Sequence, residues 1–238
     1  MKIRNLLLFG ASMMLCLSCY NKRSSEPCSS SESAVTAQNV NLQFWMTYTN
    51  EEIYEYITPA LYNAGNMFAE EKDVENPFEG GLFGGYGGVL LGADSNGKAA
   101  IDEFIAWSDK MECDALPKEL RLCWGVAPKN GMYELYAIKD ESNNAKAPLE
   151  GDIIEKAEVV KHPNSNAPLI SVKMNDCAAA TWADMTERCA NESRHIAIVV
   201  DGLVYSAPLP IERITCGESV ISGDFTMEQA RKLVAGVK

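Results

Sequence analysis

The sequence predicts an α+β fold in which a largely antiparallel sheet is covered by helices on one face. Two observations support this class. Short strand-like runs are interspersed with helical patterns along the chain, and the connections contain hairpin signals, of which Asp201 and Gly202 between two apolar runs are the clearest. The chain has 238 residues, 47% of them hydrophobic, which is enough to bury a core.

The N-terminus has the pattern of an export signal. Lys2 and Arg4 form a positively charged start, and residues 6–17 form an apolar run that is too short for an ordinary membrane span. Residues 1–18 are therefore predicted to be a signal peptide. No later apolar stretch approaches the length that crosses a bilayer, so we expect the rest of the chain to fold outside the membrane.

A cysteine directly follows the predicted signal peptide. Residues 16–19 read Cys-Leu-Ser-Cys and resemble a bacterial lipobox, in which the final cysteine is acylated and becomes the mature N-terminus. Cys19 is therefore the predicted lipidation site, although Cys16 stands where the box usually has leucine. We expect a protein that is anchored to the lipid bilayer through acylated Cys19 and faces the periplasm, on either the inner or the outer membrane. A plain secreted protein and an uncleaved anchor are the alternatives.

Charge and composition exclude several classes of partner. The formal net charge of −12 becomes −14 once Lys2 and Arg4 leave with the signal peptide, so nucleic acid and anionic lipid headgroups are poor partners. After Cys19 the sequence contains no CxxC pair, and its two histidines, His162 and His195, are isolated in the sequence. We therefore expect no metal site and no cofactor.

The cysteines are compatible with a disulfide framework in an oxidising compartment. Eight are present, and setting aside Cys16 and the anchor candidate leaves Cys28, Cys113, Cys123, Cys177, Cys189 and Cys216. One or two disulfides are expected among them. Their pairing stays open, because six scattered cysteines can pair in many ways.

The first part of the mature chain is expected to be a tether followed by a helical region. Residues 19–45 are predicted to form a flexible tether, because most of this stretch is rich in Ser, Glu, Asn and Lys and lacks apolar periodicity. Residues 46–115 are predicted to form a helical region with a glycine-rich loop. Its first helix is expected to start near Thr49 with Asn50 as its cap, and Pro59 is expected to kink or split it.

Aromatic side chains recur along this first helix at Tyr54, Tyr56, Tyr62 and Phe68. A peptide-binding surface is one interpretation of them, and core packing is the preferred one. The glycine-rich loop follows at residues 80–88. Because it precedes a predicted strand and lacks a following Gly-Lys-Ser/Thr, we interpret it as a flexible loop rather than a phosphate cradle.

The rest of the chain is predicted to contain most of the sheet and three more helices. Expected strands lie at residues 120–126, 132–138, 157–161, 169–174, 195–200, 203–206 and 220–223, and expected helices at residues 98–111, from Asn175 or Asp176 to Cys189, and from Thr226 to Ala235.

The C-terminal part carries a specific series of residues. Residues 197–208 read AIVVDGLVYSAP, and residues 221–226 read ISGDFT, with Gly217 shortly before them. This series resembles the signature of SecD, a protein-export factor. The residues that carry it, here called the motif, are Asp201, Gly202, Ser206, Ala207, Pro208, Gly217, Ser222, Gly223, Phe225 and Thr226.

Further segments extend the resemblance upstream. Residues 116–124 and 133–139 are similar to the periplasmic head of fused SecDF proteins, particularly those of Bacteroidetes, so the resemblance covers roughly residues 70–238. It implies that residues 116–238 form an α+β domain like the SecD periplasmic head. Because the motif residues also suit turns, strand ends and a helix cap, we interpret the motif as structural, with an interaction surface as the alternative.

The resemblance implies a binding module. We expect a non-catalytic envelope protein whose head contacts unfolded preprotein segments or components of the Sec translocon during export. SecD couples the proton gradient to export through transmembrane helices, and without such helices this chain is not expected to pump. A structural or regulatory lipoprotein that binds another envelope protein or a ligand is the alternative function.

An enzyme is the least favoured class. The sequence contains no Gly-x-Ser-x-Gly, HExxH or Cys-His pattern at a known spacing. The nearest catalytic candidates are His195 with Asp201 and Ser206 with Asp224. His195 opens an apolar strand, where a structural or surface histidine is the usual outcome.

Overall fold

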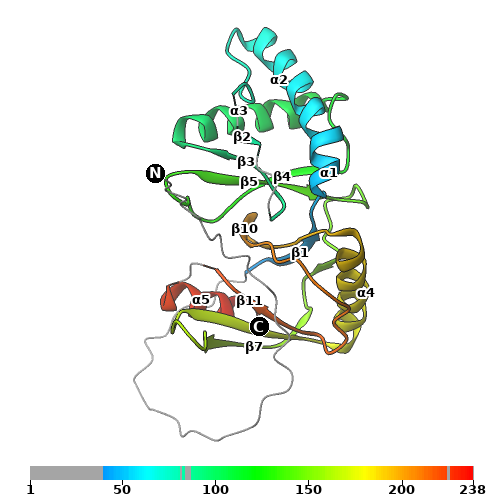
Figure 1. Cartoon of the computed structure of the whole chain (residues 1–238), viewed down its shortest axis with the longest axis vertical. Helices are drawn as coiled ribbons and strands as arrows, with labels where there is room; N and C mark the ends of the chain where they lie inside the picture. Colours follow the sequence, from blue (N-terminus) through cyan, green and yellow to red (C-terminus); the bar gives the residue numbers. More distant parts are fainter. Residues whose placement is uncertain (1–39, 81, 84–86, 224–225, 238) are drawn as a thin grey trace, which may run out of the picture.

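A computed structural model describes residues 40–80, 82–83, 87–223 and 226–237 (Figure 1). The predicted signal peptide, Cys19 and most of the predicted tether lie outside the described residues. In chain order the elements are β1 (Leu42–Met46), α1 (Asn50–Glu52), the π-helix η1 (Ile53–Ile57), α2 (Thr58–Lys72), β2 (Leu82–Phe83), β3 (Val89–Ala93), α3 (Ser95–Met111), β4 (Leu120–Trp124), β5 (Tyr133–Lys139), β6 (Leu149–Glu150), β7 (Ile154–Lys161), β8 (Pro168–Met174), α4 (Asp176–Glu192), β9 (Ile196–Val200), β10 (Leu203–Ser206), β11 (Glu218–Ile221) and α5 (Met227–Gly236).

The strands of the described residues form three sheets. The upper sheet has the order β2-β3-β5-β4, the central sheet β10-β9-β1-β6, and the lower sheet β11-β8-β7. All pairings between these strands are antiparallel. The predicted α+β class with antiparallel sheet is therefore confirmed. The division of the strands into three sheets depends on pairings between distant parts of the chain, which local patterns do not reveal.

β1 occupies an inner position of the central sheet, between β9 and β6. Its five residues pair with β9 from Leu42 opposite Val200 to Met46 opposite Ile196, and Leu42, Phe44 and Met46 are buried in the hydrophobic core. The tether predicted for residues 19–45 is therefore wrong for residues 42–45. The partner strand lies far along the chain, so the composition around β1 did not indicate it.

β9 and β10 form the predicted hairpin. The turn residues Asp201 and Gly202 have φ angles of 50° and 83°, which are the positive values that a type I′ turn requires. All five residues of β9 are buried, in agreement with the continuous apolar run in the sequence.

Local capping signals predicted the starts of α4 and α5 correctly, whereas α3 begins at Ser95, three residues before its predicted start. The side chains of Asp94, Asn175 and Thr226 accept backbone N–H bonds at the starts of α3, α4 and α5. The first helix differs from the prediction, because Thr49 rather than Asn50 is its cap. Thr49 forms a capping box with Glu52, which satisfies two backbone N–H groups at once.

Residues 50–72 form one continuous helical arm made of α1, η1 and α2, and the expected split at Pro59 is absent because Pro59 lies in the first turn of α2. Phe68 is buried in the core, but Tyr54 is 55% and Tyr56 is 63% exposed. Core packing is therefore wrong for these two tyrosines. Both lie in η1, and a π-helix has more residues per turn than an α-helix, so it changes which side chains face the core.

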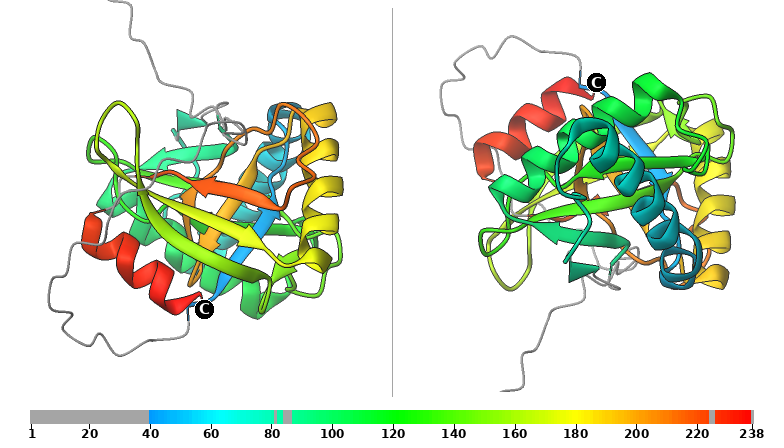
Figure 2. Two further views of the ribbon diagram at one scale, coloured as in Figure 1. Left: turned by 90° about the horizontal axis from the view of Figure 1, so that it is seen from below. Right: turned by 90° about the horizontal axis from the view of Figure 1, so that it is seen from above.

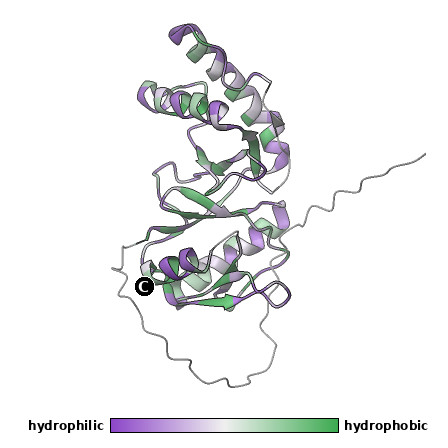
Figure 3. Ribbon diagram, turned by 90° about the vertical axis from the view of Figure 1, so that its left-hand side faces the viewer, coloured by the Kyte–Doolittle hydropathy of each residue, from purple (hydrophilic) through white to green (hydrophobic). Residues whose placement is uncertain are grey.

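Two large hydrophobic clusters hold the helices against the sheets. The upper cluster joins the helical arm, α3 and the upper sheet, and in it Phe68 packs edge-on against Phe104 with ring centroids 5.8 Å apart. The lower cluster joins the central and lower sheets with α4 and α5, and in it Phe44 packs against Trp182 at 5.4 Å. Figure 2 shows α4 and α5 on opposite sides of the molecule. Figure 3 shows strands with many hydrophobic residues next to helices that combine hydrophilic and hydrophobic residues.

The upper sheet crosses the domain boundary that was predicted at residue 116. β3 pairs with β5, which joins the region of residues 46–115 to the following region. β2, at Leu82–Phe83, pairs with β3 and lies within the glycine-rich segment. Residues 81 and 84–86 of that segment lie outside the described residues.

The described cysteines, Cys113, Cys123, Cys177, Cys189 and Cys216, are free thiols. No disulfide therefore joins any two of them. Burial raises the pKa of Cys123 to about 11 and that of Cys189 to about 12, so both stay protonated at neutral pH. Cys28 lies outside the described residues.

Across the described ranges, no helix is both long and apolar enough to cross a bilayer. The same residues contain no group of three or more His, Cys, Asp or Glu side chains placed to hold a metal ion.

Candidate functional site

The first two motif residues, Asp201 and Gly202, form the turn between β9 and β10. The Asp201 backbone N–H donates to the Asn41 carbonyl at 3.1 Å, and the Asp201 carboxylate accepts the Asn41 backbone N–H at 3.0 Å. Both bonds join the turn to the residue just before β1. The pair therefore closes the hairpin and holds the start of an inner strand.

Ser206, Ala207 and Pro208 form the exit from β10. The Ala207 carbonyl lies 2.8 Å from Nδ1 of His195, and the Pro208 carbonyl accepts the backbone N–H of Ile196 at 2.9 Å. These contacts hold the segment after β10 against the start of β9. The Ser206 hydroxyl is buried and has no hydrogen-bond partner among the described residues.

Gly217 lies where a side chain does not fit. Its φ is 66°, and a Cβ at this position would lie 2.6 Å from the Cβ of Ala179 in the first turn of α4. The Gly217 carbonyl accepts the backbone N–H of Met174 at 2.8 Å. Glycine here permits both the left-handed backbone and the close approach of α4.

The last motif residues lead into α5. Thr226 is the N-cap, and it exchanges hydrogen bonds with Gln229 in a capping box. Ser222 and Gly223 directly follow β11. Phe225 lies outside the described residues. The described motif residues thus shape the backbone at turns, strand exits and a helix cap in separate parts of the fold. Their role as an interaction surface stays a prediction.

The catalytic candidates from the sequence do not assemble. His195 and Asp201 flank β9 at its opposite ends, and six residues of extended strand span about 20 Å. Burial lowers the pKa of His195, which favours a neutral imidazole at neutral pH. Asp224, the partner considered for Ser206, lies outside the described residues.

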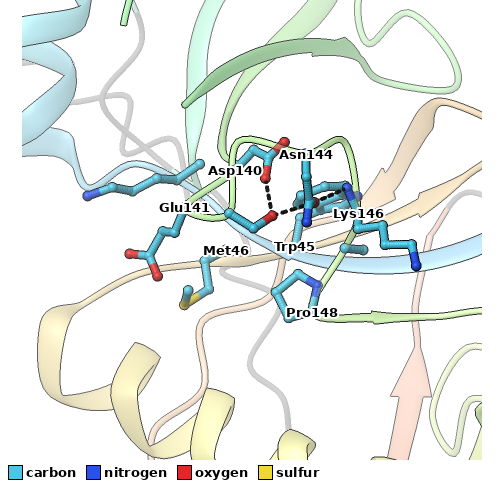
Figure 4. A pocket seen from close by; sticks show the side chains of 10 residues that line it. Trp45, Met46, Asp140, Glu141, Asn144, Lys146 and Pro148 are labelled. Carbon is cyan, nitrogen blue, oxygen red and sulfur yellow. Dashed lines mark hydrogen bonds between the residues drawn. The ribbon is translucent and has the colours of Figure 1, made fainter. Parts of the chain in front are cut away.

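Two cavities adjoin the segment from β5 to β6, and none of the described motif residues lines them. The first has a volume of about 350 Å³ and lies between the end of β1, the end of β5 and residues 140–148 (Figure 4). It is lined by Trp45, Met46, Lys139, Asp140, Glu141, Ser142, Asn144, Lys146, Ala147 and Pro148. Residues 140–148, here called the cavity loop, form most of its wall.

Asp140 organises the cavity loop. Its carboxylate accepts hydrogen bonds from Arg121 Nε at 2.9 Å, the Ser142 hydroxyl at 2.7 Å and the Ala145 backbone N–H at 2.9 Å. Burial alone would raise the pKa of Asp140, but these donors outweigh it and lower the pKa. The loop is therefore folded around a carboxylate that stays ionised at neutral pH.

The second cavity has a volume of about 500 Å³ and lies on the other side of residues 146–148. The residues around it are Lys146, Ala147, Pro148, Leu149, Glu150, Gly151, Asp152, Ile153, Asn175, Cys177, Ala178 and Thr181. They come from β6, which is the terminal strand of the central sheet, and from the first two turns of α4. We call this cavity, between a sheet edge and a helix, the β6–α4 groove.

A partly buried group of charges lies close to the first cavity. The Glu52 carboxylate accepts hydrogen bonds from Arg194 at 2.6 and 2.9 Å, from Lys139 at 2.9 Å and from the Thr49 backbone N–H at 2.9 Å. Burial alone would raise the pKa of Glu52, but these donors lower it to about 2. Only 7% of the Arg194 side chain is exposed, so this pair connects the helical arm with the start of β9 from inside the fold.

Sequence reasoning missed both cavities. Residues 140–148 have the composition of a linker, because Asp, Ser, Asn and Pro cluster there without apolar periodicity. The same composition also suits a loop that wraps around a carboxylate, as Asp140 shows. The sequence carried no signal that α4 and β6 would face each other across a groove.

Comparison with known proteins connects the C-terminal part to the Sec system. The family model described as "SecDF, P1 head subdomain" matches residues 134–238. Protein translocase subunit SecD of Desulfurispirillum indicum is 46% identical over 83 residues, and that of Rhodothermus marinus is 37% identical over 107 residues. The matched segments make up 35% and 45% of this chain but only 16% of each relative.

Solved SecDF structures also align with this chain. One, described as a membrane component SecDF that enhances protein export, aligns with 84% of this chain and 63% of its own, with a TM-score of 0.42 and 18% identity. SecDF of Thermus thermophilus, described as a translocon-associated membrane protein, aligns with 84% of this chain and 19% of its own, with a TM-score of 0.36 and 18% identity. Residues 134–238 are therefore similar to the SecDF P1 head subdomain, and the chain covers only a small part of the length of its SecD relatives.

Proposed function

We propose that this chain is a non-catalytic envelope protein whose SecD-like head binds unfolded polypeptide or Sec components during protein export. The observation that carries the proposal is the match of residues 134–238 to the SecDF P1 head subdomain, together with relatives that are translocase subunits. The net charge of −12 is consistent with a protein partner and disfavours nucleic acid.

The β6–α4 groove is the part of the head that suits an extended polypeptide. β6 is the terminal strand of the central sheet, so one edge of its backbone is not used by another strand of that sheet. Peptides commonly bind by adding a strand to such an edge, with a neighbouring helix forming the other wall. The groove volume of about 500 Å³ is in the range of protein binding sites.

Site-specific crosslinking tests this function. A photo-reactive residue at Thr181, which lines the groove, is expected to crosslink to a secretory protein arrested during export in cells. The matched control is the same residue at Ala180, which is exposed on the same helix but does not line the groove. Crosslinks are detected by mass spectrometry.

Two outcomes contradict the proposal. Equal crosslinking from Thr181 and Ala180 would show that the groove is not the binding site. Crosslinks from Thr181 to envelope proteins outside the Sec system, with none to secretory proteins, would support the alternative of a structural or regulatory lipoprotein.

We also propose that Cys19 is acylated and anchors the chain to a membrane on its periplasmic side. The support is the lipobox-like sequence of residues 16–19 after a short apolar run. Metabolic labelling with palmitate is expected to label the wild type and the Cys16→Ser variant but not Cys19→Ser. Label that persists in Cys19→Ser would contradict the assignment.

A further inference from the structure

Six charged side chains, linked by five ion pairs, form a ring next to the first cavity that the backbone closes. Its links are Lys139–Glu52 at 2.9 Å, Glu52–Arg194 at 2.6 Å, Arg194–Glu192 at 2.5 Å, Glu192–Arg188 at 2.9 Å and Arg188–Glu141 at 2.6 Å. The ring closes through the backbone, because Lys139 and Glu141 are separated only by Asp140. It joins the helical arm, the end of α4, the start of β9 and the cavity loop.

The ring has a buried side and an accessible side. The Arg194 side chain is 7% exposed, whereas the Arg188 side chain is 41% and its partner Glu141 35% exposed. Two parallel hydrogen bonds of 2.6 Å join Arg188 to Glu141. Ion pairs near the surface are weakened by salt, while buried pairs are screened much less. The Arg188–Glu141 link is therefore the part of the ring that opens most easily.

This accessible link holds the cavity loop. Glu141 belongs to the loop and lines the first cavity, and Lys146, Ala147 and Pro148 of the same loop line both cavities. Arg188 holds Glu141 against α4, whose first turns line the other side of the β6–α4 groove. The distance between the loop and α4 thus depends on a surface-accessible ion pair.

We propose that the ring is a conformational clasp for the cavity loop. When the Arg188–Glu141 link is closed, the loop is held against α4. When the link opens, the loop moves away from α4 while the Asp140–Arg121 pair still anchors its start, and both cavities widen. The clasp does not depend on which molecule binds in the cavities, so it stands apart from the proposed export function.

Hydrogen exchange of the full chain, read by mass spectrometry, tests the clasp. Glu141→Gln removes the charge of the accessible link and keeps the shape of the side chain. We expect the backbone amides of residues 142–147 to exchange about threefold to fivefold faster, the range that corresponds to loss of a strong surface ion pair. The amides of Ala145 and Ala147 are useful reporters, because they donate to Asp140 and Glu150 in the closed state.

The matched control is Glu187→Gln. Glu187 also lies on α4 and pairs with an arginine, Arg213, but this pair is not part of the ring. We expect no change in the cavity loop for this variant. Exposing the wild type to 1 M salt is expected to reproduce the effect of Glu141→Gln, and the Glu141→Gln variant itself should respond little to salt.

A second variant tests the ring as a unit. Glu52→Gln does not touch Glu141, yet it is expected to raise exchange in the cavity loop as well as in the helical arm. Three outcomes would each overturn the clasp. The cavity loop could exchange at the wild-type rate in Glu141→Gln, or exchange could rise equally throughout α4 and β9. The effect of Glu52→Gln could also be confined to the helical arm.

Discussion

Gly217→Ala is expected to lower the free energy of unfolding by about 3 kcal/mol, measured by urea denaturation. Two effects add at this position. The backbone has a φ of 66°, which costs alanine about 1 kcal/mol, and the new Cβ would lie 2.6 Å from the Cβ of Ala179. Relieving such a contact inside a packed structure costs about 1 to 3 kcal/mol, because α4 must move away from the strand.

Two further variants separate the two effects. Gly151 has a φ of 76° with nothing within 4 Å of an added Cβ, so Gly151→Ala should show the backbone cost alone, about 1 kcal/mol. The double variant Gly217→Ala with Ala179→Gly removes the close contact, and it should be more stable than the sum of the two single changes predicts. Equal effects of Gly217→Ala and Gly151→Ala would show that α4 does not press against Gly217.

Arg194→Met is expected to destabilise the fold by about 2 to 3 kcal/mol at pH 7. The substitution keeps much of the side-chain volume but leaves the Glu52 carboxylate without its two strongest donors. Removing one partner of a buried ion pair costs about 3 to 5 kcal/mol of folding stability. We expect a smaller loss of stability here because 21% of the Glu52 side chain is exposed. Arg213→Met, which breaks surface pairs with Asp184 and Glu187, should cost less than about 1 kcal/mol.

The same pair determines part of the pH dependence of stability. The pKa of Glu52 in the folded state is about 2, below its ordinary value of 4.5. A depressed carboxyl pKa contributes stability that is complete above about pH 4.5 and is lost as the pH falls towards 2. In Arg194→Met this loss should be smaller, so the stability difference between the variant and the wild type should shrink between pH 7 and pH 3. A stability difference between the variant and the wild type that stays constant from pH 7 to pH 3 would contradict the assignment of this pH dependence to the Glu52–Arg194 pair.

The parts of the fold that the sequence predicted well are those with local causes. Asp201 and Gly202 form a turn because adjacent residues with positive φ suffice for it. Asn175 and Thr226 cap helices because each bonds a backbone group two or three residues away. The SecD-like series was identifiable for the same reason, since its described residues occupy turns, strand exits and a cap.

The parts that the sequence did not predict depend on partners far apart in the chain. β1 was assigned to the tether because β9, its pairing strand, comes much later in the sequence. Tyr54 and Tyr56 were assigned to the core because the π-helical turn that exposes them has no clear local signal. The cavity loop has the composition of a linker, and only the tertiary structure shows that bonds to Arg121 and Arg188 hold it in place.

The sequence by itself therefore determined the α+β class, the local turns and caps, and the relationship of the C-terminal part to the SecD head. Only the tertiary structure decided the division into three sheets, the inner position of β1, the β6–α4 groove and the ring of ion pairs. The physical reason is distance along the chain. Glu52 and Arg194 are brought into contact only by the packing of the helical arm against the central sheet, and no local pattern of residues encodes that contact.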